Sequence, residues 1–354
     1  MQIDHIHFYV WDAAKWRRWF VEVMGFYCIA YGCNNHTYTE VVGSGKIKFV
    51  LSSPLSKYSP VAEYLSKHPE GVADVAFEVE EIEKVMEKAR ASGAKVEKAI
   101  AFQTNLKWCQ IISCASLKHT LIERRGETFL LPYNWVQSCY QESYYSQTLE
   151  EIRFTEIDHL VLNVAAGELE NTVSWYEKVL GFQRKQTFTI GTEKSALYSQ
   201  VMIHPKSGVQ FPVNEPMSVN SQIQEFIELN GGSGIQHLAL KTNQITQVTQ
   251  KLRSKGVEFL AVPKSYYTQM QKLNFSPQEW SEIMDQEILV DTEGNKSDNS
   301  PLLLQIFTQP IFNEPTFFFE LIERRFQAKG FGEGNFRALF EAIEREQMKR
   351  GSLR

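Results

Sequence analysis

The sequence predicts an α+β protein built from two halves of similar plan, and three observations support this fold class. Apolar strand-like runs alternate with amphipathic helical stretches in each half. A length of 354 residues with 43% hydrophobic content is enough for two domains, each with its own core. Three pairs of segments also recur between the halves in the same order: 1–6 with 155–160, 71–77 with 234–240, and 120–125 with 320–325.

Each half is expected to begin with a strand, a helix and several strands, and then to repeat that order. The first helix of each half is rich in aromatic residues and ends in a hydrophobic-Gly-Phe step, at Gly25 and at Gly181. Glycine just past the last helical turn is a common end signal. Amphipathic helices are predicted at about 79–93 and 243–255. This order of elements favours a curved mixed sheet in each half.

The repeat also predicts the domain boundaries. We expect an N-terminal domain at residues 1–125 and a C-terminal domain at residues 153–354. The segment 126–152 between them is rich in Tyr, Ser and Gln and has weak periodicity. It is therefore predicted to be a linker.

Charge and composition exclude several classes of partner. A net charge of -5 and a pI near 6.0 give no basic field for nucleic acid or an anionic membrane, so a small-molecule partner is expected. No apolar run approaches the roughly 20 residues that span a bilayer. The five cysteines form no CxxC pair, and the N-terminus lacks a basic segment followed by an apolar one. These features predict a cytoplasmic protein.

Three strong metal ligands lie inside apolar strand-like segments of the second half: His159, His237 and Glu320. Two neutral imidazoles and one carboxylate are the ligands of non-haem Fe(II) oxygenases, and they leave coordination positions open. In a strand, Glu320 shares a face with Phe318 and Ile322, where an unpaired carboxylate would be costly to bury. We therefore predict one Fe(II) per chain at these three residues.

The first half carries His5, Asp74 and Thr120 at the corresponding positions. Threonine cannot supply the anionic oxygen of a carboxylate, so the first domain is predicted to be metal-free. Taken singly, either histidine of the second half could be an ordinary core or surface residue, and Glu320 could pair with a neighbouring cation. The shared repeat positions favour the ligand interpretation.

These motifs resemble the 4-hydroxyphenylpyruvate dioxygenase family of the vicinal-oxygen-chelate superfamily, over nearly the whole chain and most specifically from about residue 155 onward. The resemblance implies two vicinal-oxygen-chelate domains, each of paired βαβββ modules that form an open, curved β-barrel. It implies that His159, His237 and Glu320 bind the iron. It also implies a C-terminal lid helix at about 336–349.

The resemblance further implies the substrate residues, most of them in five segments: 197–199, 211–216, 221–224, 304–308 and 330–336. Catalytic roles are implied for Ser199, Asn214, Gln222 and Gln305. These four and seven more residues are implied to contact the substrate: Pro212, Gln236, Phe307, Phe318, Phe331, Asn335 and Phe336.

Two of these implications can be examined from the residues themselves. Three glycines at 330–334 permit a tight, movable turn, and the neighbouring aromatics supply an apolar cover; the alternative is a terminal helix that merely packs on the sheet. Gln305 and Phe307 share a face with each other. Counting by twos places both opposite to Glu320, although Pro310 and Pro315 interrupt the count.

The family activity is the conversion of 4-hydroxyphenylpyruvate and O₂ to homogentisate and CO₂, for tyrosine catabolism or prenylquinone precursor supply. The nearest alternative is hydroxymandelate synthase, which oxidises the benzylic carbon; Pro212 and Asn214 favour ring hydroxylation. A non-catalytic aromatic-ligand or metal-binding protein on the same scaffold is a further alternative. Extradiol ring cleavage would need an additional acid–base residue, for which the sequence offers no strong candidate. A homo-oligomer, dimer or tetramer, is expected.

Overall fold

The computed structural model describes residues 1–126, 131–132, 138–139, 152–269, 275–292 and 300–353. The first half consists of two βαβββ modules. The first module contains β1 (Gln2–Tyr9), α1 (Ala13–Glu22), β2 (Tyr27–Cys33), β3 (Thr37–Ser44) and β4 (Ile47–Pro54). The second contains β5 (Gly71–Glu78), α3 (Ile82–Ala91), β6 (Lys95–Gln103), β7 (Leu106–Ile112) and β8 (Lys118–Arg124), after the short helix α2 (Pro60–Leu65).

The second half repeats this plan with additional helices. Its first module contains β10 (Ile157–Asn163), α4 (Leu169–Trp175) with the π-helical turn η2 (Tyr176–Leu180), β11 (Gln183–Gly191), β12 (Ala196–Ile203) and β13 (Gln210–Pro216). Its second contains β14 (Gly234–Lys241), α6 (Ile245–Ser254), β15 (Leu289–Thr292), β16 (Leu302–Phe307) and β17 (Phe318–Arg325). The additional helices are α5 (Gln222–Asn230), α7 (Lys264–Gln269), α8 (Pro277–Asp285) and α9 (Glu333–Arg350).

Both sheets are mixed and share one topology. The first strands of the two modules pair antiparallel in each half, as β1 with β5 and β10 with β14. Each first strand also pairs parallel with the last strand of its own module. The strand orders are β6-β7-β8-β5-β1-β4-β3-β2-β9, where β9 is Ser138–Cys139, and β11-β12-β13-β10-β14-β17-β16-β15. The prediction of two α+β halves of paired βαβββ modules is therefore confirmed.

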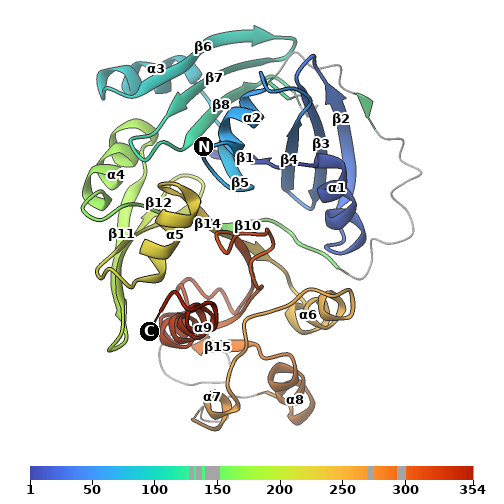
Figure 1. The fold of residues 1–354 in the computed structure, drawn as a ribbon, viewed down its shortest axis with the longest axis vertical. Helices are drawn as coiled ribbons and strands as arrows, with labels where there is room; N and C mark the ends of the chain where they lie inside the picture. The colour runs from blue at the N-terminus through green and yellow to red at the C-terminus, as the bar shows by residue number, and fades with distance from the viewer. Residues whose placement is uncertain (127–130, 133–137, 140–151, 270–274, 293–299, 354) are drawn as a thin grey trace.

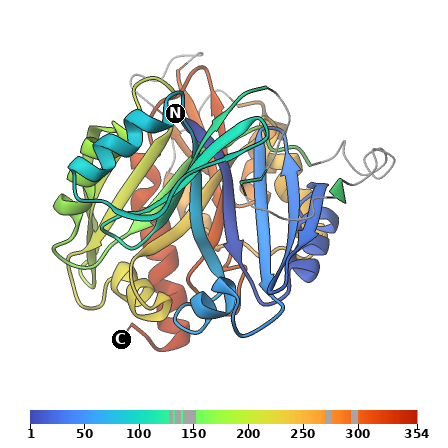
Figure 2. The ribbon, with the colours of Figure 1, turned by 90° about the horizontal axis from the view of Figure 1, so that it is seen from above.

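The helices cover the outer surfaces of this arrangement. Figure 1 places α9 against the second sheet, between β11 and β15, where it contacts both strands. Figure 2 shows the same ribbon from above, with the blue α1 and the teal α3 on opposite sides of the first half. None of the described helices combines the length and the hydropathy needed to cross a lipid bilayer.

Aromatic side chains join the two halves behind β17. Phe317, just before this strand, packs against Phe8 of β1 with ring centroids 5.3 Å apart. Phe319 stacks on Phe49 of β4 at 6.0 Å. Because side chains alternate along a strand, Phe318 and Glu320 face the opposite side. The first half thus supports the strand that carries the predicted carboxylate ligand.

Two predicted boundaries need comment. The lid helix was expected from about 336, but α9 begins at Glu333, because Gly332 adopts a left-handed conformation with φ of 78° and serves as the N-cap. Most of the predicted linker 126–152 lies outside the described residues. Within it, β9 (Ser138–Cys139) pairs with β2, so this short piece joins the first sheet. The domain boundaries themselves stay a prediction.

Candidate metal centre and substrate pocket

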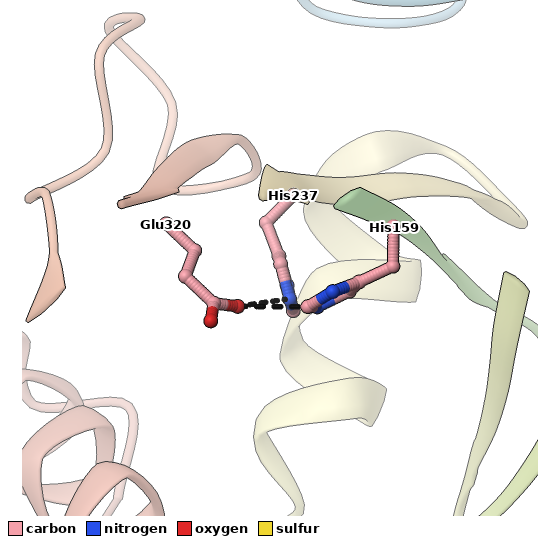
Figure 3. Close-up of side chains that lie close together, drawn as sticks. All are labelled: His159, His237 and Glu320. Carbon is pink, nitrogen blue, oxygen red and sulfur yellow. Dashed lines mark ion pairs between the residues drawn. The ribbon is translucent and has the colours of Figure 1, made fainter. Parts of the chain in front are cut away.

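The three predicted ligands lie on three adjacent strands, β10, β14 and β17, in the middle of the second sheet. Figure 3 shows His159, His237 and Glu320 pointing toward one another. Glu320 Oε2 lies 3.2 Å from His159 Nε2 and 3.6 Å from His237 Nε2. All three residues are buried, and their ligand atoms lie within 4.8 Å of one another. This donor set, two imidazole nitrogens and a carboxylate oxygen, fits a divalent transition metal.

Neighbouring side chains orient both imidazoles. His159 Nδ1 lies 2.9 Å from Asp158 Oδ1, and Arg324 holds both oxygens of that carboxylate, at 2.7 and 2.6 Å. The His237 ring stacks on Phe318 with ring centroids 4.8 Å apart. Fixing Nδ1 in this way turns Nε2 of His159 toward Glu320, and such orienting contacts are a regular part of metal sites.

The carboxylates around His159 give the site a strong preference for positive charge. Burial by itself would lower the pKa of His159, but Glu320 and Asp158 outweigh it and raise that pKa to about 9. Burial, together with the charge on His159, holds the pKa of His237 well below its usual value. The negative surroundings that raise the pKa of His159 would favour a bound metal cation in the same way.

A cavity opens in front of the three predicted ligands, with about 730 Å³ of empty space when its open mouth is included. Every residue for which the sequence predicted a catalytic or substrate role lines it: Ser199, Pro212, Asn214, Gln222, Gln236, Gln305, Phe307, Phe318, Phe331, Asn335 and Phe336. The structure thus brings these side chains together with the three ligands, whereas their individual roles stay predictions.

One part of the cavity wall is polar. Ser199 on β12 lies directly opposite Asn214 on β13, and Asn214 Nδ2 donates to Asn163 Oδ1 at 3.3 Å. Gln222 Oε1 is buried and has no hydrogen-bond partner among the described residues. A buried acceptor without a partner is costly, so it favours a ligand that brings a donor. A hydroxyl group on the ligand would satisfy it.

Comparisons with known proteins agree with this arrangement. Residues 2–105 and 156–281 match the family model of the Glyoxalase/Bleomycin resistance protein/Dioxygenase superfamily. The 4-hydroxyphenylpyruvate dioxygenase of Yarrowia lipolytica is 39% identical over 374 residues, covering 99% of this chain and 93% of that protein. The chain belongs to the 4-hydroxyphenylpyruvate dioxygenase family. An uncharacterized protein of Synechocystis sp. is 37% identical over 350 residues, covering 97% of each.

A solved structure shows the same fold over the whole chain. It is a triple mutant of 4-hydroxymandelate synthase from Streptomyces coelicolor, with a TM-score of 0.87, 25% sequence identity and 98% coverage of both chains. Membership in the family makes the chain an enzyme of the non-haem dioxygenase type, with a metal-dependent site and a small-molecule substrate.

Sequence reasoning missed most of the apolar wall of the cavity. The additional lining residues are Val161, Phe188, Ile190, Leu197, Val201, Ile223, Gly332, Leu339, Phe340 and Ile343. Two signals could have found several of them. Val161 is two residues from His159, and Leu197 and Val201 are two residues either side of Ser199, so each shares a strand face with a predicted site residue. The residues from Phe336 to Ile343 follow the spacing of one helix face.

The amide of Gln305 is tied to the metal ligands and to the turn before α9. Its Nε2 donates to Glu320 Oε1 at 2.9 Å and to the carbonyl oxygen of Phe331 at 3.2 Å. Antiparallel pairing of β16 and β17 sets Phe307 opposite Glu320. The segment with Pro310 and Pro315, which the sequence indicated as an interruption, separates the two strands, so Gln305 and Phe307 share a face with Glu320. Gly332 has a φ of 78°, and a Cβ there would lie 2.0 Å from Gln305 Oε1, so a larger residue would be strained and would displace the Gln305 amide.

Proposed function

We propose that the chain is an Fe(II)-dependent 4-hydroxyphenylpyruvate dioxygenase, which converts 4-hydroxyphenylpyruvate and O₂ to homogentisate and CO₂. One observation carries the proposal: a single cavity joins the cluster of His159, His237 and Glu320 to the polar wall of Ser199, Asn214 and Gln222. An α-keto acid suits the first region, and a phenol hydroxyl suits the second. The names of the relatives support the same substrate.

The spacing of the two regions suits a ligand of this length. Asn214 lies opposite Asn163, which is four residues along β10 from His159. Four residues of an extended strand span about 13 Å between Cα atoms. Side chains that lean into the cavity from both ends shorten that span. A benzene ring with a three-carbon acid at one end and a hydroxyl at the other can then reach both.

Each chain would hold one iron ion through His159, His237 and Glu320, the only cluster of this kind among the described residues. When bound, Fe(II) would supply open coordination positions for the keto acid and for O₂, and the electrons that activate O₂. Decarboxylation of the substrate provides the remaining reducing equivalents, so the overall reaction needs no second α-keto acid. One oxygen atom enters the new carboxylate and the other becomes the ring hydroxyl.

The chain's own residues would orient the substrate and exclude water. Gln222 Oε1 would accept the phenol proton, and the Asn214 amide would donate to the phenol oxygen. The aromatic side chains of Phe307, Phe318 and Phe331 form dry walls beside the ligands. Excluding water from this space protects a reactive oxidant from side reactions.

The lid would complete the enclosure. Phe336, in the first turns of α9, packs edge-to-face on Phe188 of β11 with ring centroids 4.8 Å apart. Phe331 lies edge-on to the His159 ring at 5.4 Å. The helix and the turn before it thus each contribute one aromatic ring to the cavity wall. Movement of the Gly-rich turn at 330–334 would open it.

Hydroxymandelate synthase activity is the second candidate, because the solved structure of that enzyme shares the fold over the whole chain. The same keto acid would then be oxidised at the benzylic carbon. Pro212 and Asn214 both line the cavity and favour ring hydroxylation. A cytoplasmic location and a homo-oligomer of two or four chains stay predictions.

Oxygen uptake tests the proposal directly. Metal-stripped protein is loaded with Fe(II), mixed with 4-hydroxyphenylpyruvate in an oxygen electrode, and the products are separated by chromatography. We expect one O₂ consumed per homogentisate formed, and no uptake with 4-hydroxyphenylacetate, which lacks the keto acid. Formation of 4-hydroxymandelate would establish the second candidate instead. Absence of uptake with iron bound would leave a non-catalytic binding protein.

A further inference from the structure

A chain of side-chain hydrogen bonds leads from Glu320 across β16 to the lid and on to α7. Glu320 Oε1 accepts from Gln305 Nε2 at 2.9 Å, and Gln305 Oε1 accepts from Asn335 Nδ2 at 2.9 Å. Asn335 Oδ1 in turn accepts from the hydroxyl of Tyr266 at 2.7 Å. The backbone N–H of Val290 donates to the same hydroxyl oxygen at 2.9 Å. These hydrogen bonds thus connect a predicted metal ligand on β17 to four other elements: β16, α9, α7 and β15.

The direction of every bond in this chain is determined. A carboxylate can only accept, so Gln305 must present its NH₂ group to Glu320 and its carbonyl to Asn335. Asn335 must then present its NH₂ group to Gln305 and its carbonyl to Tyr266. In its bond with Asn335 Oδ1 the phenol must donate, and the Val290 carbonyl oxygen at 2.9 Å is a second acceptor for the same proton. Burial raises the pKa of Tyr266, so the hydroxyl keeps the proton that this requires.

The chain also fixes how Glu320 faces the two histidines. Gln305 engages Oε1, while Oε2 is the oxygen 3.2 Å from His159 Nε2. If either amide turned over, a carbonyl oxygen would face the carboxylate or the next carbonyl at about the distance of a hydrogen bond, which is repulsive. The orientation of the Glu320 carboxylate therefore depends on the donor–acceptor direction of every hydrogen bond in the series, including the one from Tyr266.

We propose that Tyr266 is a positioning residue of the metal centre, which sets the polarity of the Asn335–Gln305 amide chain and thereby presents Glu320 Oε2 to the metal. This inference rests on the proposed function for the identity of the reaction, but not for the presence of a metal. Both amides lie in or beside the lid, so closure of α9 and correct orientation of Glu320 are one event. An open lid leaves Gln305 without its partner Asn335.

A purely structural role for Tyr266 makes a different prediction. β15 is the edge strand of its sheet, and the Tyr266 hydroxyl lies 2.9 Å from both the N–H and the carbonyl oxygen of Val290. On that view the phenol only satisfies an exposed backbone edge, and its removal would change stability alone. Tyr267 offers a matched comparison, because its hydroxyl donates to the carbonyl oxygen of Ile288 at 3.1 Å and takes no part in the chain.

The test compares Tyr266→Phe with Tyr267→Phe in the full-length protein, using Co(II) as the metal probe. For Tyr266→Phe we expect Co(II) affinity to fall about three- to tenfold, the effect of losing roughly one hydrogen bond, with a shift in the visible Co(II) absorption bands. Tyr267→Phe should keep the wild-type affinity and spectrum while losing comparable thermal stability. Wild-type Co(II) affinity and spectrum in Tyr266→Phe would overturn the proposal.

Two additions keep the outcome decisive. If Tyr266→Phe fails to fold, Asn335→Asp removes the donor to Gln305 at nearly constant volume, and it should weaken Co(II) binding at least as much; unchanged binding would overturn the proposal. Co(II) binding is measured without substrate. The test of the hydrogen-bond chain therefore remains valid even if the protein consumes no O₂ with 4-hydroxyphenylpyruvate. In an active protein, kcat should fall in Tyr266→Phe with a smaller change in KM.

Discussion

The two halves place side chains at the same three positions of similar sheets, but two of the three residues differ and so do their contacts. In the second half, Glu320 Oε2 lies 3.2 Å from His159 Nε2 and 3.6 Å from His237 Nε2. In the first half, Asp74 Oδ2 accepts from Thr120 Oγ1 at 2.6 Å and from Gln110 Nε2 at 2.8 Å. The first-half carboxylate is thus satisfied by short neutral donors, which leave it without a reason to bind a cation.

The aspartate and arginine that hold the first-strand histidine are nevertheless the same in both halves. His5 Nδ1 lies 2.6 Å from Asp4, and Arg124 holds both oxygens of Asp4 at 2.9 Å. This reproduces the contacts of Asp158 with His159 and Arg324. A histidine held by an aspartate and an arginine is therefore a feature of the scaffold. The candidate metal site differs from the first half at the other two positions, where His237 and Glu320 stand in place of Asp74 and Thr120.

The largest expected effect comes from making the second half like the first. Glu320→Thr removes the anionic ligand, so metal affinity should fall by more than about 100-fold, the upper range for losing a residue that only orients a ligand. Turnover should fall with it. Co(II) titration and oxygen uptake measure the two effects. Glu320→Asp, which keeps a carboxylate on a shorter side chain, should lose less, and equal losses would contradict the ligand assignment.

A pair of matched substitutions tests whether Asp158 and Asp4, which make the same contacts, have different roles in the two halves. Asp158→Asn weakens the hold on His159, and we expect metal affinity to fall about 10- to 100-fold. Asp4→Asn makes the same change at the equivalent point of the first half. It should lower the thermal unfolding midpoint and leave Co(II) affinity unchanged. A loss of metal binding in Asp4→Asn would mean that the contacts of Asp4 in the first half affect the metal site of the second half.

The smallest effect is expected from the polar cluster of the first half. Thr120→Val removes the hydroxyl that donates to the buried Asp74, so the free energy of unfolding should decrease by about 1–3 kcal/mol. Urea unfolding followed by circular dichroism measures it, and Thr120→Ser, which keeps the hydroxyl, is the control. Metal affinity and turnover should match the wild type. A change in either would assign the first half a part in catalysis.

The fold could be predicted well from the sequence because matching segments occur in both halves. Matching segments at 1–6 and 155–160, and at 120–125 and 320–325, marked the first and last strands of each half. The ligands followed from residue types that are costly to bury inside such strands. These signals are local, so they can be recognised in the sequence without knowing the turns between the elements.

The missed features depend on geometry that the sequence does not state. Tyr266 lies on a short helix between α6 and β15, and no periodicity links it to Glu320. The start of α9 at Glu333 depends on the left-handed conformation of Gly332, which in turn accommodates Gln305. The register of β16 on β17 depends on a turn rather than on strand alternation. In each case a contact between distant segments decides the outcome.

The aromatic contacts between β17 and the first half have a consequence for how far the second half depends on the first. Phe8 and Phe49 belong to the half without the ligand set, and they cover Phe317 and Phe319 on the reverse of the strand that carries Glu320. Deleting that half would expose this apolar surface to water and free the strand to shift. The first half therefore serves the strand of Glu320 as a packing surface, and its removal is expected to disturb the candidate metal site as well.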